Sequence, residues 1–195
     1  MAFIATVPDG SAQAPAELYD EERESWGFVP NFATTFALRP EVYLAWKQLV
    51  TAIRSSMDAR RYELATVGAA AALRSSYCTL AHGRALAGLM PPEGVVQLLT
   101  DREAAPVDDA ERAVITFAEK VALDADHIEQ ADVDGLRAHG LTDEEIFDVV
   151  LTAAARCFFS KTLDATGTAP DAAFHELEPR LRAALTVGRP IADAP

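Results

Sequence analysis

The sequence predicts an all-α fold of about eight to ten helices in one domain. Apolar side chains recur at helical spacing along most of the chain, and proline or glycine stands at the ends of these segments. Half of the 195 residues are hydrophobic, which is enough for one domain with a substantial core. We therefore expect residues 1–195 to form a single helical domain.

Three helices are predicted before residue 56. Residues 15–26 are acidic and amphipathic and stop at Gly27, and a short helix follows from Pro30 and Asn31 to Leu38. Pro40 then starts a helix that runs to about Ser55. The side chains expected to pack from this third helix are apolar: Val42, Leu44, Ala45, Leu49, Val50 and Ile53.

An alanine-rich helix is expected over 58–75, with Asp58 as its cap, and small side chains make it a central element. A helix over 76–89 follows, and Pro91 with Pro92 ends it and begins a short helix over 93–100. The loop 101–107 separates an N-terminal half, about 1–105, from a C-terminal half, about 106–185.

The C-terminal half begins with an amphipathic helix over 108–123 and a shorter helix over 132–139 that Gly140 closes. Thr142 and Glu145 form a capping box for a long helix. Its expected buried stripe is Ile146, Val149, Val150, Ala153, Ala154, Cys157 and Phe158. Residues 186–195 read as a frayed tail.

Charge and hydropathy exclude several functional classes. The formal net charge is −13, without a compact Lys/Arg cluster, so neither nucleic acid nor an anionic membrane is an expected partner. The N-terminus has no basic region of a signal peptide, and the apolar runs are too short to cross a bilayer. We expect a cytoplasmic protein, in which two cysteines make a disulfide framework implausible.

Cys78 and His82 carry the clearest chemical pattern. Their i, i+4 spacing places both side chains on one helix face, where an imidazole can affect a thiol. Ser75 and Ser76 are good N-cap residues, so Cys78 falls in a first turn, whose dipole favours thiolate. The alternative is structural, since a free cysteine is usually a small buried hydrophobe.

Other candidates favour a structural interpretation. Cys157 falls on an apolar stripe, and a resolving role would need its Cα within about 7 Å of that of Cys78. His127, His139 and His175 show no metal-ligand spacing, and no phosphate loop is present, so we expect no metal and no cofactor. Four aromatic residues are candidates for an apolar wall near Cys78: Phe28, Phe32, Trp46 and Tyr77.

The order Glu63, Ser75, Tyr77, Cys78, His82 resembles the active-site pattern of the AhpD-like alkylhydroperoxidase and carboxymuconolactone decarboxylase superfamily. That pattern is a glutamate followed by C-x-x-C-x-x-x-H, and this chain has S-x-x-C-x-x-x-H. The segments GFVPNF (27–32), RPEVYLAW (39–46) and ADVDGLRAHGLTDEEIFDVV (131–150) are similar to the peroxidase-related branch.

The resemblance implies an AhpD-like helical fold and a redox site. Cys78 matches the cysteine that reacts with peroxide or an oxidised partner, and Glu63 and His82 match the proton relay that activates it. Ser75 stands where the family has its resolving cysteine, which a serine cannot replace. The resemblance also implies a homo-oligomer, as a dimer, trimer or hexamer.

Three functions remain open. The first is a one-cysteine peroxidase, in which Cys78 is oxidised by a hydroperoxide, an external thiol reduces it, and Ser75 hydrogen-bonds the sulfur. The second is a cofactor-free decarboxylase or isomerase that moves protons with His82 and Glu63. The third is a non-catalytic oligomer that binds a small ligand or a partner protein.

Overall fold

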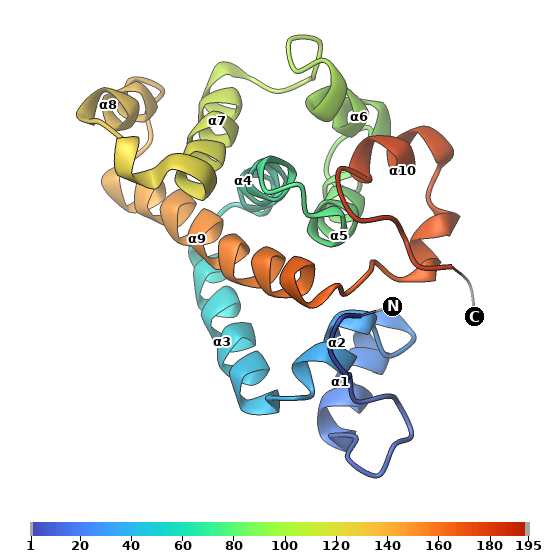
Figure 1. Cartoon of the computed structure of the whole chain (residues 1–195). Helices are drawn as coiled ribbons and strands as arrows, with labels where there is room; N and C mark the ends of the chain where they lie inside the picture. Colours follow the sequence, from blue (N-terminus) through green and yellow to red (C-terminus); the bar gives the residue numbers. More distant parts are fainter. Residues whose placement is uncertain (1, 194–195) are drawn as a thin grey trace.

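The computed structural model describes residues 2–193 and confirms the all-α fold, since ten α-helices and no strand occur within that range (Figure 1). The α-helices are α1 (Ala16–Trp26), α2 (Asn31–Phe36), α3 (Pro40–Ser56), α4 (Ala59–Ala72), α5 (Ser76–Leu86), α6 (Pro92–Thr100), α7 (Asp109–Asp124), α8 (Gln130–Ala138), α9 (Asp143–Thr166) and α10 (Pro179–Leu185). The described residues also form two short 3₁₀ helices, η1 (Ala125–His127) and η2 (Ala172–Glu176).

The alanine-rich helix α4 is the centre of the molecule, as the sequence predicts. Residues 62–70 are all buried, and α4 packs against α7, α5 and α9 (Figure 1). At Gly68 a Cβ would lie 2.9 Å from Cγ2 of Ile115 on α7. The absence of a side chain there lets the two helix axes approach closely.

Local capping explains why the helices begin where they do. The Asp58 side chain accepts a hydrogen bond from the Arg61 backbone N–H at 3.0 Å. Thr142 and Glu145 form the predicted capping box at the start of α9, and Glu129 with Asp132 forms another that starts α8 at Gln130, earlier than expected.

The turn between α4 and α5 is tighter than predicted. Helix α4 ends at Ala72 rather than Ser75, because Arg74 adopts the left-handed conformation, with φ of 57°. This turn lets α5 start at Ser76 and pack beside α4, and residues 75–80 are all buried. Helices α2 and α5 end slightly early, at Phe36 and Leu86.

The buried stripe predicted for α9 is partly wrong. Ala154 and Phe158 are exposed, whereas Arg156 and Phe159 are buried. The reason is that α9 packs on α4 and α7 along one side and on α2 and α3 along another, so two faces of the helix turn inward. One of these faces places the guanidinium of Arg156 in the core.

The packing predicted for α3 is also partly wrong. Four of its expected contacts are exposed, namely Val42, Leu44, Ala45 and Leu49, and Val50 is half-buried. Ile53 is buried as predicted, and Tyr43 is buried in place of the others. Helix α3 lies at the outside of the molecule against α9 and α2 (Figure 1), so only a narrow strip of it is covered.

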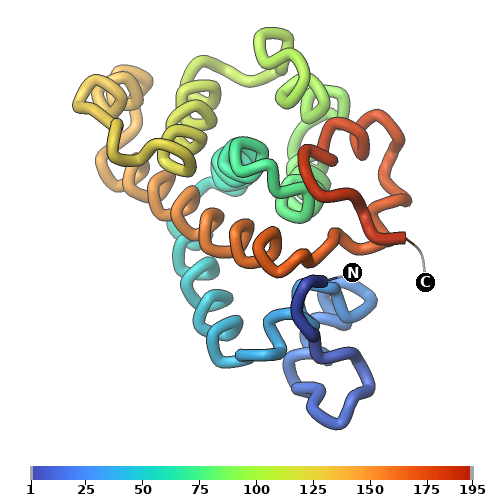
Figure 2. The backbone as a smooth tube through the Cα atoms, viewed as in Figure 1, coloured from blue at the N-terminus to red at the C-terminus, as the bar shows by residue number. Residues whose placement is uncertain are grey.

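The C-terminal segment is ordered by contacts with the rest of the fold, contrary to the frayed tail expected for 186–195. Helix α10 packs on α6 and α5, and the chain then crosses the end of α5 (Figure 2), where Gly188 N–H donates to Ser76 Oγ at 2.7 Å. Ala192 N–H donates to the Pro170 carbonyl at 2.8 Å. Residues 194–195 lie outside the described range.

Helix length and composition also bear on membranes. No helix among residues 2–193 combines the length and apolar character that a bilayer crossing requires.

Candidate active site

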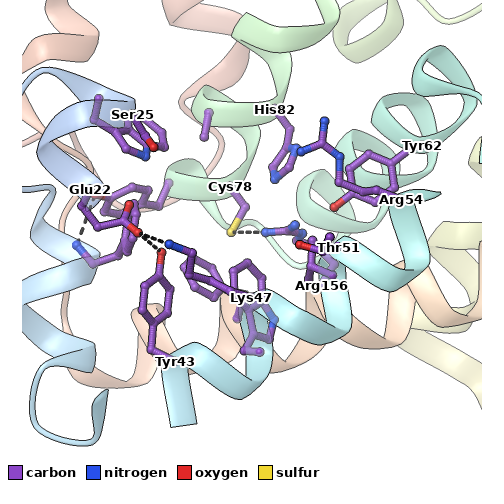
Figure 3. Close-up of a pocket in the computed structure, with 17 residues that line it drawn as sticks. Glu22, Ser25, Tyr43, Lys47, Thr51, Arg54, Tyr62, Cys78, His82 and Arg156 are labelled. Carbon is purple, nitrogen blue, oxygen red and sulfur yellow. Dashed lines mark hydrogen bonds and ion pairs between the residues drawn. The ribbon is translucent and has the colours of Figure 1, made fainter. Parts of the chain in front are cut away.

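A cavity of about 280 Å³ is lined by residues of α1, α2, α3, α4, α5 and α9 (Figure 3). Its walls are largely aromatic: Trp26, Phe32, Tyr43, Trp46, Tyr62, Tyr77 and Phe159. Three of the four aromatics predicted near the site therefore line it, and Phe28 does not; it packs edge-on against Trp26 instead. The polar lining includes Cys78 and His82 from one face of α5.

Cys78 lies in the first turn of α5 and is 1% exposed. Its sulfur accepts a hydrogen bond from Nη1 of Arg156 on α9 at 3.4 Å (Figure 3). The positive end of the α5 dipole and a guanidinium are therefore both directed at the sulfur.

Arg156 is the residue that sequence reasoning missed. It is 2% exposed, and no carboxylate among the described residues forms an ion pair with it. Its guanidinium lies over the rings of Phe159 and Trp46, at 5.7 and 6.0 Å from their centroids. Burial acts to lower the pKa of Arg156, but the neighbouring Cys78 and Tyr62 outweigh it and raise that pKa. The hydrogen-bond partner of this buried guanidinium is thus the sulfur of Cys78.

Glu63 on α4 and His82 on α5 form the predicted pair. His82 Nδ1 lies 2.7 Å from Glu63 Oε2, and Glu63 is 4% exposed. Burial, and then the charge of Arg156, lowers the pKa of His82 below its ordinary value of 6.5. The imidazole is therefore neutral at pH 7, with the Nδ1 proton assigned by its bond to Glu63. Nε2 is left as a proton acceptor.

Tyr77 contributes its ring to the cavity but uses its hydroxyl elsewhere. The hydroxyl donates to Asp171 Oδ2 and accepts from the Phe32 N–H at 3.2 Å. Asp171 Oδ1 in turn accepts from the Asn31 N–H at 2.8 Å. Burial, followed by the charge of Asp171, raises the pKa of Tyr77 well above 10. The hydroxyl therefore ties α5 to the start of α2 and is not aimed at Cys78.

Comparisons with known proteins agree with this geometry. The model of the carboxymuconolactone decarboxylase family matches residues 40–120, the part of the chain that contains Glu63, Cys78 and His82. The fold is similar to that of the alkylhydroperoxidase AhpD core of an uncharacterised peroxidase-related protein from Ralstonia eutropha JMP134. The two share 27% identity and a TM-score of 0.79, over 89% of this chain and 94% of that one. These matches support the AhpD-like carboxymuconolactone decarboxylase superfamily as the one that this chain resembles.

Two further structures extend the comparison. An uncharacterised peroxidase-related protein from Silicibacter sp. TM1040 is 26% identical, with a TM-score of 0.76 over 88% of this chain and 94% of that one. The debrominase Bmp8, as a cysteine-to-alanine variant in complex with 2,3,4-tribromopyrrole, is 18% identical with a TM-score of 0.72, over 93% and 96% of the two chains. At that identity the similarity concerns the fold. Comparison with curated proteins gives no significant match.

Ser75, at the position of the first cysteine of the superfamily pattern, does not reach the cavity. It is fully buried before α5, and its hydroxyl has no well-formed hydrogen bond among the described residues. Burial raises the pKa of Asp164 on α9, and the nearby Ser75 hydroxyl acts to lower it. The expected bond from Ser75 to the Cys78 sulfur is absent from the described structure, and Arg156 occupies that role.

Cys157 faces away from the site. It is half-buried against α7, where Sγ lies 3.7 Å from the Ala122 carbonyl oxygen. Burial raises the pKa of this thiol. Arg156, the adjacent residue on α9, turns toward Cys78, so Cys157 lies on a different face of the helix and belongs to a separate group of packed side chains.

The remaining histidines lie outside the cavity. Asp124, Asp126 and His127 place one ligand atom each within 4.8 Å of one another, but all three are exposed and belong to the end of α7 and to η1. His139 follows α8 directly, as its position before Gly140 predicts. None of these side chains contributes to the site built around Cys78.

Proposed function

We propose that this protein is a thiol-dependent peroxidase that reduces small organic hydroperoxides with Cys78. The observation that carries the proposal is the cysteine sulfur in an aromatic-lined cavity, hydrogen-bonded to a buried guanidinium that has no carboxylate partner among the described residues. A buried guanidinium requires an anion nearby. The thiolate form of Cys78 supplies one, and the same form is the nucleophile that peroxide reduction requires.

His82 and Glu63 carry out the transfer of the Cys78 thiol proton in this proposal. Neutral His82 accepts the thiol proton at Nε2, and Glu63 holds Nδ1 and stabilises the imidazolium that results. Since His82 stands one turn after Cys78 on α5, it faces the same cavity as the sulfur. The proton can then move on to the leaving oxygen without solvent.

Peroxide reduction at Cys78 transfers one oxygen atom to the sulfur. The thiolate attacks the distal oxygen of the hydroperoxide, a sulfur–oxygen bond forms and the O–O bond breaks. The alkoxide leaves with the O–O electron pair and takes the proton from imidazolium His82. Cys78 is oxidised to a sulfenic acid, and the hydroperoxide is reduced to an alcohol.

Regeneration requires a reductant from outside the chain. Ser75 has no thiol, and Cys157 lies against α7 on another face of α9. One external thiol condenses with the sulfenic acid to give a mixed disulfide and water, and a second thiol releases Cys78 and leaves as the external disulfide. A small thiol or a redox protein with an accessible cysteine suits this step.

A second function is favoured by one specific observation, the neutral imidazole with a free Nε2 beside the arginines. Such a base removes a proton from a carbon next to a carbonyl, and guanidinium groups stabilise the enolate that forms. In this reaction Cys78 would shape the cavity without reacting. The superfamily name includes a decarboxylase of the kind that such chemistry serves.

Trapping the sulfenic acid separates the two functions. The native protein is treated briefly with cumene hydroperoxide and a sulfenate-specific reagent, and intact mass is measured beside Cys78→Ser and the control Cys157→Ser. The peroxidase proposal expects trapping in the native and Cys157→Ser proteins, with loss in Cys78→Ser. An unmodified native protein would overturn the peroxidase proposal. If Cys78→Ser still exchanges the proton on a carbon next to a carbonyl, the second function is favoured.

A further inference from the structure

The charged groups of the cavity are not balanced within the chain. The carboxylate that lines it, Glu22, accepts hydrogen bonds from Tyr43 at 2.8 Å and from Lys47 at 3.1 Å. Lys47 also contacts Glu21 at 2.8 Å. Glu22 and Lys47 therefore form an ion pair with each other. Glu63 is hydrogen-bonded to His82 and does not line the cavity.

Two arginines remain without acidic partners in this part of the described structure. Arg156 contacts Cys78, and Arg54 lies over the ring of Tyr62, 5.1 Å from its centroid, with no ion pair. The next arginines along the chain behave differently, since Arg60 pairs with Glu111 and Arg61 with Glu145. Glu22 is the one carboxylate among the described residues that line the cavity, although the chain has a net charge of −13.

The two arginines stand at different depths. Arg156 is 2% exposed beside the sulfur, whereas Arg54 is exposed and lines the cavity, which places it at the opening. Aromatic side chains form the wall, including Tyr62 and Tyr43, which Figure 3 labels. Once Cys78 is ionised, its thiolate occupies Arg156. Among the cations that line the cavity, Arg54 is then the one without an anionic partner in the described structure.

We infer that the cavity takes a small molecule with an apolar, preferably aromatic, body and a carboxylate at one end, which Arg54 binds at the opening while the other end reaches Cys78. This inference rests on the proposed function for the reaction, in which the substrate is a carboxylate-bearing hydroperoxide. The volume of about 280 Å³ lies at the lower limit of the usual range for ligand pockets. A single ring with short substituents fits that space.

Binding can be tested without turnover, because both tryptophans of the chain, Trp26 and Trp46, line the cavity. Benzoate is titrated against the native protein with tryptophan fluorescence as the readout, excited at a wavelength that benzoate does not absorb. Benzamide serves as its uncharged isostere. We expect saturable binding of benzoate that is at least tenfold tighter than that of benzamide, since a guanidinium binds a carboxylate through charge-assisted hydrogen bonds.

Arg54→Gln is the deciding variant, and Arg39→Gln is its matched control. Both remove one exposed positive charge, and Arg39 precedes α3 outside the cavity. The preference for benzoate should disappear in Arg54→Gln and persist in Arg39→Gln. Equal binding of benzoate and benzamide to the native protein, an unchanged preference in Arg54→Gln, or no saturation by either probe would overturn the inference.

The same titration on Cys78→Ser separates this inference from the proposed function. Preferential benzoate binding there, together with no sulfenic acid in the native protein, would retain the carboxylate site and reject the peroxidase. Sulfenic acid formation without any preference for benzoate would do the reverse.

Discussion

Nη1 of Arg156, on α9, lies 3.4 Å from the sulfur of Cys78, on α5, and both residues are almost wholly buried. The two residues are 78 positions apart in the chain. Their contact links the nucleophile to a cation that has no carboxylate partner in the described structure, and it yields the most direct test of the site.

Arg156→Gln should slow the alkylation of Cys78 by iodoacetamide at pH 7. A hydrogen bond from a charged donor contributes about 1.5–3 kcal/mol, so we expect a loss of roughly ten- to a hundredfold in rate. Intact mass after timed quenching gives the rate. Lys161→Gln, which removes a positive charge from the exposed surface of the same helix, should leave the rate within about twofold of native. Equal rates in all three proteins would exclude the proposed role of Arg156.

His82→Ala and Glu63→Gln should both lower kcat/KM for cumene hydroperoxide with an external thiol. A positioned general base contributes about 10²- to 10⁴-fold, so His82→Ala should lose at least a hundredfold. Glu63→Gln should lose less, because the imidazole stays in place and loses only the carboxylate that orients Nδ1. His139→Ala, outside the cavity, is the control. A Glu63→Gln protein with native kcat/KM would remove Glu63 from the mechanism.

The stability of the fold should depend on His82 below neutral pH. Burial lowers the pKa of His82 below 6.5, so between the lower folded pKa and 6.5 the unfolded chain binds the proton more strongly. The contribution of this histidine is therefore present above pH 6.5 and is lost as pH falls toward the folded pKa. Urea unfolding at pH 7.5, 6.5 and 5.5 should show a smaller decline in His82→Gln than in the native protein. Parallel declines would contradict this assignment.

Tyr77→Phe should destabilise the fold while leaving Cys78 reactive. The change removes the bond to Asp171 and leaves a buried carboxylate with fewer donors, at a cost of about 1–3 kcal/mol in the free energy of unfolding. A double-mutant cycle with Asp171→Asn measures the coupling by urea unfolding. Alkylation of Cys78 should stay within about twofold of native. A large loss of reactivity in a stable Tyr77→Phe protein would show that the hydroxyl acts on the sulfur.

Gly83→Ala should loosen the packing between α5 and α10. A Cβ at Gly83 would lie 2.2 Å from Cδ2 of Leu185, and such overpacking costs about 1–3 kcal/mol. The thermal midpoint should fall, and Leu185→Ala combined with Gly83→Ala should be less destabilised than the sum of the two single changes. Additive losses would mean that the two side chains do not meet in solution.

The sequence is informative about the site where the chemistry is local. Cys78 and His82 are one helical turn apart, and their common face follows from spacing alone. The placement of Glu63 beside His82 needs the α4–α5 packing, and in the sequence it came from resemblance to a family pattern. Ser75 shows the limit of that reasoning, because the left-handed Arg74 just before it sets the direction of its side chain in a way that spacing does not encode.

Arg156 could not be located from spacing, because its partner lies on another helix. A signal was nevertheless present, since Arg156 stands inside the apolar run VVLTAAARCFF and falls on the same helix face as Val149, Ser160 and Leu163, all of which are buried. A charged residue on a core-facing stripe is a candidate for function. The errors for α3 have a similar origin, because periodicity identifies an apolar face without showing whether another helix covers it.

The face of α5 that packs against residues 185–188 is completed late in biosynthesis. Thr79 Oγ1 donates to the Leu185 carbonyl oxygen at 2.5 Å, Gly83 packs on the Leu185 side chain, and Ser76 Oγ accepts from Gly188 N–H. The helix that carries the nucleophile is thus covered by residues synthesised about a hundred positions later. During translation α5 stays uncovered until residues 185–188 have emerged from the ribosome, so a nascent chain acquires its completed thiol site only once that segment is free to pack.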